Sequence, residues 1–386
     1  MANTTQFFEK EEPAIAAGFG RPSRHGLAKG ERAAFTINGR FLSQKVTGVQ
    51  RYAREVAAKL DGLVAEANTN ARLCAPKACD ESATYQALNY EASSRASGVV
   101  WEQLYLPWRR QGPLLNLCNM APLAAPEQIV CIHDVNTFLQ PDSYSAAFRL
   151  YYRIMLPLVA RRAARIATVS EFSARMIERH LGVKRRDIQV LPNGHEHVWR
   201  WRPSDATIFE THHLRRPYVL LIASRAKHKN IGLVLSLAEQ LNGLGIDIWV
   251  AGGSSAIFSG APGTNEPNVK WLGYVSDDDL GALLANAMCL AFPSLTEGFG
   301  LPLVEAMALG CPIIASDRAS IPEICGEAAL LASPDNPGLW IAQIELLARS
   351  NVLRSELVDE GRSRVRAFSW DKTASGYHDL LREVAA

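Results

Sequence analysis

The sequence predicts an α/β protein made of two successive units, each with a parallel sheet. Short apolar runs alternate with amphipathic helical patterns along most of the chain, and this alternation is typical of doubly wound parallel sheets. It stops at Pro192-Asn193-Gly194 and starts again after Arg216-Pro217. The 386 residues suffice for two or three domains of about 100–200 residues each. The simplest arrangement is therefore two α/β units with a boundary between residues 195 and 216.

The first unit is predicted to span residues 32–200. Residues 1–31 are small, polar or charged without any period, and we expect a flexible tail there. Within the unit, short apolar runs indicate strands, and apolar positions three and four apart indicate helices. The predicted strands are 34–37, 128–132, 166–169 and 188–191, and the predicted helices are 49–60, 145–165 and 171–181.

The second unit is predicted to span residues 217–368 and repeats the alternation. A final segment, 369–386, carries a helical pattern over 370–384, which we expect to cross back and pack on the first unit. Ligands of such sheets bind beyond the carboxyl ends of the strands, so the cleft between two facing sheets is the expected site. The predicted strands of the second unit are 218–222, 246–251, 269–272, 288–292 and 312–315, and its predicted helices are 232–241, 277–287 and 301–309.

The composition excludes several classes of protein. A chain that is 48% hydrophobic and 21% charged is neither disordered nor collagen-like. Its net charge of +2 is too balanced for a dedicated nucleic-acid binder. No apolar run approaches the ~18–20 residues of a membrane span, and the N-terminal residues lack the basic-then-apolar order of a signal peptide. The seven scattered cysteines indicate reduced thiols, so we expect a cytoplasmic protein.

Residues 293–305 follow a predicted strand and open a predicted helix. Gly298 and Gly300 let the backbone approach a ligand closely. The free N–H groups at the helix start form an anion site suited to a diphosphate. Glu305, in the first turn, can accept hydrogen bonds from a ribose or sugar diol, and Glu297 lies on the other side of the phosphate position. On local physics alone, a capped helix with Glu305 complementing its dipole explains the pattern equally well.

These two glutamates and the residues between them resemble the signature of the retaining glycosyltransferases of family GT4, which have the GT-B fold of two facing Rossmann-like domains. The similarity includes residues 272–275, 306–312 and 321–323, and extends from about Phe35 to the end. It implies that Glu305 holds the nucleotide ribose and that Glu297, a catalytic residue, contacts hydroxyls of the transferred sugar. The further donor contacts that it implies are Val275, Gly298, Phe299, Gly300 and Leu301.

A basic segment, 223–230, lies between a predicted strand and a predicted helix and carries Arg225 and Lys229. An arginine can donate two hydrogen bonds to phosphate oxygens, and a lysine adds a positive point charge. Isolated basic turns, however, are usually solvated surface features. The resemblance implies an Arg/Lys pair here that binds and neutralises the departing diphosphate. Lys229 matches the family pattern through the following Asn230. The arginine position of the family falls on Ser224, one residue before Arg225.

His133 comes directly after a predicted strand. A histidine there can donate to a sugar hydroxyl or transfer a proton, although a lone histidine is more often structural. The resemblance implies a catalytic histidine near the outer hydroxyls of the donor sugar. It also implies that Gly48 lets the start of the first helix approach the diphosphate. Ser170 is predicted as a helix N-cap and lines the cleft in the family.

An acidic run, Asp277-Asp278-Asp279, resembles the metal motif of a different glycosyltransferase fold. It follows Ser276 and precedes an apolar helical pattern, where aspartates cap a helix and complement its dipole. We interpret it as a helix start. The GT-B resemblance implies no metal and no other cofactor, because basic side chains and helix dipoles hold the diphosphate there. Cys74 and Cys79 lack the paired spacing of a zinc site.

Residues 145–165 carry five arginines and no Asp or Glu, interleaved with aromatic and aliphatic residues. Such a helix can lie on an anionic membrane surface, or it can pack on the core with a solvated basic face. The Trp101-Glu102-Gln103 region resembles bacterial exopolysaccharide glycosyltransferases, many of which use polyprenyl-diphosphate-linked sugars. We therefore expect a peripheral protein on the inner face of the plasma membrane, with a glycan or lipid-linked acceptor and no nucleic-acid partner.

Together these features predict a metal-independent retaining hexosyltransferase of surface polysaccharide synthesis. The resemblance to exopolysaccharide mannosyltransferases favours GDP-mannose as the donor, with a UDP-sugar second. The same diphosphate site also suits a nucleotide-sugar epimerase, a sugar-phosphate synthase or a non-catalytic nucleotide-sugar-binding subunit. A nicotinamide dehydrogenase is disfavoured, because no Gly-x-Gly-x-x-Gly follows the first strand of either unit.

Overall fold

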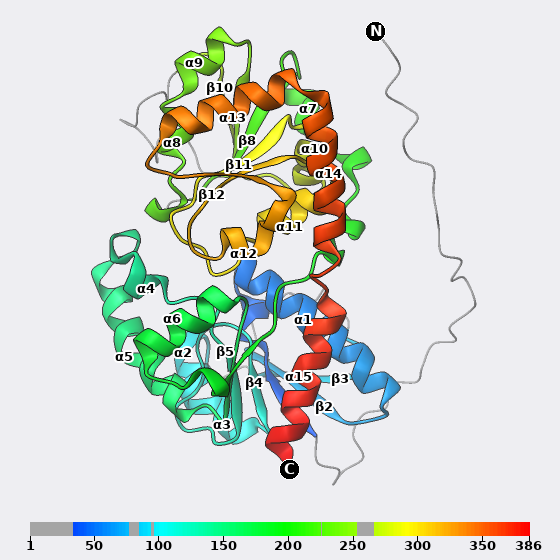
Figure 1. Ribbon diagram of the computed structural model, residues 1–386. Coiled ribbons are helices and arrows are strands. Elements are labelled where there is room, and N and C mark those ends of the chain that lie inside the picture. Colours follow the sequence, from blue (N-terminus) through cyan, green and yellow to red (C-terminus); the bar gives the residue numbers. More distant parts are fainter. Residues whose placement is uncertain (1–33, 77–84, 94–95, 225, 253–265) are drawn as a thin grey trace, which may run out of the picture. The chain divides into compact units, whose positions relative to one another are not determined.

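The computed structural model describes residues 34–76, 85–93, 96–224, 226–252 and 266–386 (Figure 1). The predicted tail, together with Arg225 and Cys79, lies outside the described residues.

Seven parallel strands form the first sheet, in the order β3-β2-β1-β4-β5-β6-β7. The order reverses direction at β1, which lies inside the sheet and is buried along its whole length. The strands are β1 (Phe35–Asn38), β2 (Ala71–Pro76), β3 (Leu88–Ser93), β4 (Leu114–Asn116), β5 (Gln128–Cys131), β6 (Arg165–Thr168) and β7 (Ile188–Val190).

The helices of this half follow the strands, as a parallel sheet requires. Trp101–Tyr105 forms a π-helical stretch, η2, between two short α-helices. The helices are α1 (Gly48–Glu66), α2 (Gly98–Val100), α3 (Leu106–Arg109), α4 (Asn136–Leu139), α5 (Ala146–Arg162) and α6 (Glu171–Leu181).

Six parallel strands form the second sheet, in the order β10-β9-β8-β11-β12-β13. The strands are β8 (Tyr218–Ile222), β9 (Asp247–Ala251), β10 (Val269–Gly273), β11 (Cys289–Phe292), β12 (Ile313–Ser316) and β13 (Leu330–Ala332). The helices are α7 (Ile208–Thr211), α8 (Gly232–Leu235), α9 (Ala238–Gly243), α10 (Asp277–Asn286), α11 (Leu301–Ala308), α12 (Ile321–Cys325), α13 (Pro337–Arg349) and α14 (Asn351–Val365).

The last helix, α15 (Trp370–Ala385), returns to the first sheet and packs along α1 (Figure 1). The Tyr52 and Tyr377 hydroxyls, one from each helix, lie 3.0 Å apart in a buried contact. Lys59 Nζ donates to Asp371 Oδ2 at 3.0 Å on the exposed side. The predicted return of the C-terminal helix is confirmed.

Every predicted strand coincides with an observed one to within one residue at either end. One predicted helix, 232–241, is wrong as a single element, because the chain forms α8 and α9 with a turn between them. In that turn the Ser236 hydroxyl donates to the Leu233 carbonyl at 2.7 Å, and a serine side chain that takes a backbone acceptor favours a turn over a continuing helix.

Candidate functional site

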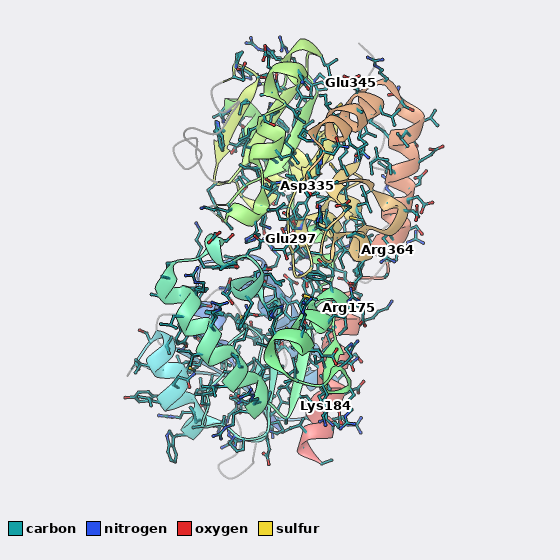
Figure 2. All side chains as sticks on the ribbon, turned by 60° about the vertical axis from the view of Figure 1, so that its left-hand side comes forward. Arg175, Lys184, Glu297, Asp335, Glu345 and Arg364 are labelled. Atoms are coloured by element: carbon teal, nitrogen blue, oxygen red, sulfur yellow. The ribbon has the colours of Figure 1, made fainter. Side chains whose placement is uncertain are left out.

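The loops beyond the carboxyl ends of both sheets line one cavity of about 1150 Å³, here called the donor cavity. This is where open α/β sheets bind ligands, and Figure 2 shows Glu297 where the two halves of the chain meet. The volume slightly exceeds that of common small-ligand pockets, ~300–1,000 Å³. All the described residues of the predicted site line it: Gly48, His133, Lys229, Val275, Glu297, Gly298, Phe299, Gly300, Leu301 and Glu305. Arg225 lies outside the described residues.

The start of α11 faces this cavity. Gly300 is its N-terminal cap residue, with a φ of 97°, a left-handed conformation that favours glycine. No side chain among the described residues caps the helix. Pro302 has no N–H and the Leu303 N–H donates to the Gly300 carbonyl at 2.9 Å, so the Leu301 N–H and the positive end of the helix dipole are what the start of α11 offers to an anion. Glu305 is buried, 4% exposed, and as the fifth residue of α11 it lies in the second turn and not in the predicted first turn. The helix start therefore has the geometry that a diphosphate site needs.

Lys229 and Glu297 form an ion pair at the cavity wall. The Lys229 Nζ donates to Glu297 Oε1 at 2.7 Å and lies 5.3 Å from the centre of the Phe292 ring. The Glu297 side chain is 10% exposed and that of Lys229 23%. A pair so close to the surface of a cavity can exchange its internal contact for contacts with a bound ligand.

Three serine hydroxyls from the starts of two helices, α6 and α12, hold the backbone of the 297–299 loop. Ser170 and Ser173 both donate to the Gly298 carbonyl, at 2.6 and 3.1 Å, and Ser320 donates to the carbonyls of Glu297 and Phe299, at 3.0 and 3.1 Å. A Cβ on Gly298 would lie 2.4 Å from the His133 carbonyl oxygen. Glycine is therefore required for the close contact between the loop and the end of β5.

Ser170 also accepts from the Ser173 N–H at 3.0 Å. The predicted N-cap of α6 is thus confirmed, and the same hydroxyl contacts the 297–299 loop. Glu323 strengthens this contact, because its two carboxylate oxygens accept from the N–H groups of Glu171 and Phe172 at 2.7 and 2.9 Å.

His133 is buried, 6% exposed, with its Nε2 2.8 Å from the Leu117 carbonyl. A carbonyl only accepts, so Nε2 carries the proton and donates. Burial lowers the pKa of His133 to about 4, although the hydrogen bond to Leu117 acts in the opposite direction. The ring is therefore neutral at pH 7.

This pKa predicts that acid destabilises the protein. Between pH 6.5 and 4 the unfolded chain binds a proton at His133 and the folded chain does not, so the free energy of unfolding falls as pH falls through that window. The full effect of His133 is about 3 kcal/mol. Denaturant unfolding at pH 7 and pH 4.5 measures it. His133→Gln should lose less stability over this interval than the wild type, and an equal loss in both proteins would refute the assignment.

Glu305 is held by a buried chain of hydrogen bonds from distant parts of the sequence. The Trp370 indole Nε1–H donates to His197 Nδ1 at 3.1 Å. Because indole is a donor only, Nδ1 accepts and the proton of the ring lies on Nε2, which donates to Glu305 Oε1 at 3.0 Å. His197 and Trp370 are both 0% exposed. The crossing of the C-terminal segment thereby fixes the Glu305 carboxylate.

We expect His197→Phe to weaken nucleoside-diphosphate binding about tenfold, since one buried hydrogen bond to a carboxylate is lost. Titration calorimetry of the variant with GDP and UDP gives the dissociation constants. His195→Phe is the control, because the Nδ1 of that neighbouring histidine bonds to the Phe368 carbonyl instead. Equal affinities in both variants would exclude a positioning role for His197.

The acidic run 277–279 begins α10, as predicted. Ser276 and Asp279 form a capping box. Asp278 accepts from the Arg202 N–H at 2.7 Å, and Asp277 accepts both guanidinium arms of Arg51, at 3.0 and 2.6 Å. Among the described residues, no three His, Cys, Asp or Glu side chains cluster as metal ligands.

Arg51 was not predicted from the sequence, yet it lines the donor cavity from α1. Its two hydrogen bonds to Asp277 connect α1, which packs with the first sheet, to α10, which packs with the second.

The cysteines in the described part of the chain are all free.

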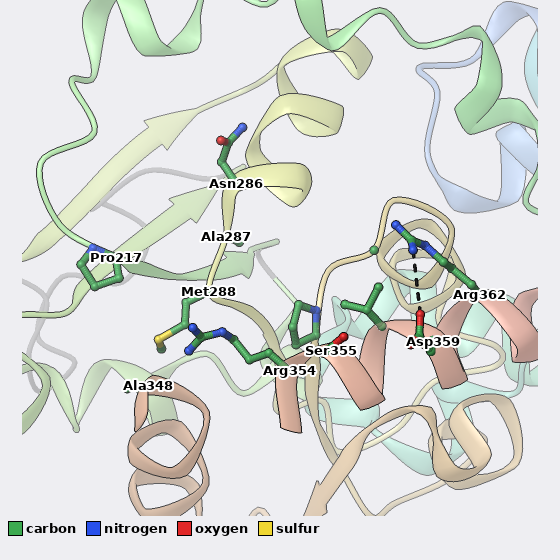
Figure 3. Close-up of a pocket in the computed structure, with 12 residues that line it drawn as sticks. Pro217, Asn286, Ala287, Met288, Ala348, Arg354, Ser355, Asp359 and Arg362 are labelled. Carbon is green, nitrogen blue, oxygen red and sulfur yellow. Dashed lines mark ion pairs between the residues drawn. The ribbon is translucent and has the colours of Figure 1, made fainter. Parts of the chain in front are cut away.

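Another cavity, of about 570 Å³, lies between α14 and the ends of α10 and α11 (Figure 3). It contains none of the predicted site residues. Arg354 donates to the Leu347 carbonyl and to Asn351, and Arg362 pairs with Asp359 at 3.9 Å. Helix C-termini carry partial negative charge, so this cavity lacks the features of a diphosphate site.

Comparison with known proteins gives matches along both halves. The model of the glycosyl transferases group 1 matches residues 205–364, and that of glycosyltransferase family 4 matches residues 112–199. The O-antigen chain mannosyltransferase RfbU of Salmonella typhimurium is 26% identical over 67% of this chain and 73% of its own length. The O-antigen chain mannosyltransferase B of Escherichia coli is 38% identical over 28% of this chain and 29% of its own length.

Among solved structures, sucrose-phosphate synthase from Thermosynechococcus elongatus superposes with a TM-score of 0.69 at 17% identity. The match covers 90% of this chain and 98% of that one. A likeness at this identity shows the fold alone.

Proposed function

Because the chain belongs to glycosyltransferase family 4, we propose that it transfers a hexose from a nucleoside-diphospho-sugar to an acceptor hydroxyl with retention of configuration. The observation that carries the proposal is the arrangement of three features around one cavity: the uncapped start of α11, the Lys229–Glu297 pair and the positioned Glu305 carboxylate. In this proposal the start of α11 binds the diphosphate, the Lys229–Glu297 pair contacts the sugar, and Glu305 binds the ribose.

In the proposed reaction, the diphosphate binds against the start of α11 and takes Lys229 as its counter-charge. Glu297 then loses its internal partner and accepts hydrogen bonds from hydroxyls of the donor sugar. Charge develops on the diphosphate as the bond to the anomeric carbon breaks, and Lys229 and the α11 dipole stabilise it. The leaving phosphate takes the proton of the acceptor hydroxyl, which attacks the same face of the sugar. The His133 ring, which is neutral at pH 7, lies beside the sugar in this arrangement and adds no charge there.

We propose GDP-mannose as the donor and a UDP-sugar as the second candidate. The names of the two relatives, both O-antigen mannosyltransferases, support mannose. Thermal unfolding with GDP, UDP or ADP, in the presence of EDTA, tests the choice. A nucleotide at about 100 times its Kd adds about 2.7 kcal/mol. A shift with GDP alone supports GDP-mannose, a shift with UDP alone replaces it by a UDP-sugar, and no shift with any of them refutes the proposed function.

The acceptor is proposed to be a glycan carried on a polyprenyl diphosphate at the inner face of the membrane. One side of α5 packs on the core, whereas Leu150, Ile154 and Leu158 are 61%, 53% and 40% exposed. Exposed arginines lie on the same helix. We call this set the apolar–basic surface: Leu150, Arg153, Ile154, Leu158, Arg161 and Arg162. Among the described helices, none has the length and hydropathy to cross a membrane.

Sedimentation with vesicles tests this surface. The chain is expected to bind vesicles that contain phosphatidylglycerol and to bind phosphatidylcholine vesicles weakly. Replacing Arg153, Arg161 and Arg162 by Gln should reduce the binding free energy by about 1 kcal/mol per arginine. Equal binding of the triple variant and the wild type would exclude α5 as the membrane contact.

A further inference from the structure

A second cavity, of about 440 Å³, adjoins the donor cavity on the first-sheet side. Thr47 and Val49 line both cavities, so the start of α1 forms the wall between them. We propose that this cavity, the acceptor pocket, holds the neutral terminal sugar of the lipid-linked glycan; this inference rests on the proposed function and names the part of the acceptor that the chain recognises.

The charge of the lining favours an uncharged ligand. Among the described residues that line the pocket, Arg40 and Glu102 carry charge, and they form an ion pair of 2.5 Å. The second Glu102 oxygen accepts from Asn38 Nδ2 at 2.9 Å. A compensated pair attracts neither a phosphate nor a cation strongly. The other polar residues of the wall carry uncharged amides, hydroxyls and one thiol, and amides and hydroxyls suit a polyol: Asn38, Gln44, Thr47, Gln50, Cys118, Asn119, Tyr151 and Tyr152.

Two polar atoms of pocket-lining residues are buried without a hydrogen-bond partner among the described residues. They are Arg40 Nε and the Tyr151 hydroxyl. A buried polar group that lacks a partner destabilises the protein that contains it, and such groups in native proteins call for an explanation. A sugar hydroxyl that reaches either atom would satisfy it.

Stacked aromatic rings run from the donor cavity to the acceptor pocket. Tyr144, which lines the donor cavity, stacks on Phe148 at 5.4 Å between ring centres, and Phe148 stacks on Tyr152 at 4.3 Å. Phe148 and Tyr152 line the acceptor pocket, and Phe148 is 41% exposed. Flat apolar rings beside convergent polar groups form the kind of lining that orients a small ligand, and a sugar ring presents C–H groups on its faces.

The backbone at Glu102 has an unusual conformation. Glu102, 2% exposed, lies in the π-helical stretch Trp101–Tyr105, and single π-turns occur often at functional sites. On the same stretch and its neighbours, Val100, Leu104 and Trp108 are 56%, 62% and 89% exposed. The π-helical stretch and α5 both contribute lining residues to the pocket, Glu102 from the first and Tyr151 from the second, so a lipid-linked glycan with its sugar inside would have the exposed apolar residues of these two elements available for its lipid.

The test measures binding of octyl glycosides of mannose, glucose, galactose and N-acetylglucosamine to the full chain by saturation-transfer NMR, with octanol as a competitor. We expect at least one glycoside to bind through its sugar protons without displacement by octanol. Phe148→Ala and Arg40→Met should weaken it about tenfold. Tyr151→Phe should weaken it too while leaving the melting temperature unchanged or higher, since the lost hydroxyl has no hydrogen-bond partner among the residues that the structure describes.

Leu346→Ala is the control, because it shortens a half-exposed apolar side chain on α13, outside both cavities. Binding of none of the four glycosides, or equal binding by all variants, overturns the acceptor pocket. GDP and UDP binding is measured on the same samples. A chain that binds nucleotide but no glycoside contradicts the acceptor pocket alone, whereas a chain that binds neither nucleotide contradicts the proposed function.

Discussion

Lys229→Ala is expected to lower turnover about 10²–10³-fold, the usual effect of removing one group that stabilises developing charge. Lys229 is the cation that contacts Glu297 in the donor cavity, at 2.7 Å. Without it, no lysine lines the described part of the cavity, and of the two lining arginines, Arg51 and Arg54, the first is already paired with Asp277. Nucleotide release from GDP-mannose and from UDP-sugars, in the presence of a membrane extract, measures turnover.

Lys270→Ala provides a matched control. Lys270 pairs with the buried Asp247 at 2.9 Å and lies 4.8 Å from the Trp249 ring, so it resembles Lys229 in exposure and contacts but lies outside the donor cavity. Both variants lose a similar ion pair, and their melting temperatures should fall by similar amounts. Full turnover in Lys229→Ala, or an equal loss in both variants, would contradict a catalytic role for Lys229.

Gly298→Ala is expected to lower kcat about 100-fold while nucleotide affinity stays within a few-fold of the wild type. The new Cβ would lie 2.4 Å from the His133 carbonyl and 3.1 Å from the Asp134 Cβ. The 297–299 loop must therefore move away from the end of β5, which displaces Glu297 from the sugar position. Glu305 keeps its contact with His197 and continues to hold the ribose.

Calorimetry with GDP or UDP and steady-state kinetics together separate these two effects. The control is Gly62→Ala, in the middle of α1, where a Cβ meets no atom within 4 Å; it should stabilise the chain by about 0.5–1 kcal/mol. Wild-type kcat in Gly298→Ala would show that the close contact with His133 is unnecessary for turnover.

Much of the fold follows from local patterns. Nine of the thirteen described strands are short apolar runs that periodicity located to within one residue. The pattern missed β2, β3, β4 and β13. Two of them, β4 and β13, span only three residues each, β3 has exposed and half-buried residues, and β2 contains Arg72 and ends in Pro76. The family and the GT-B fold, both predicted from residues 297–305 and their surroundings, are confirmed.

The site was predictable where its residues adjoin in sequence, and not where they meet only in space. Glu297, Gly298, Gly300 and Glu305 form one continuous segment, whereas His197 contacts Glu305 across 108 positions and Trp370 contacts His197 across 173. No spacing rule relates residues so far apart, because the crossing of α15 and the linker brings them together. Arg51 and Asp277, separated by 226 positions, illustrate the same limit.

The most direct test is transfer itself. The purified chain is incubated with anomerically ¹³C-labelled GDP-mannose, and in parallel with UDP-glucose, together with a lipid extract of bacterial membranes and EDTA. We predict that label passes from one of these α-linked donors to the lipid fraction and that NMR of the product shows an α-glycosidic linkage. A β-linked product would contradict retention, and nucleotide binding without transfer from either donor would contradict a hexosyltransferase.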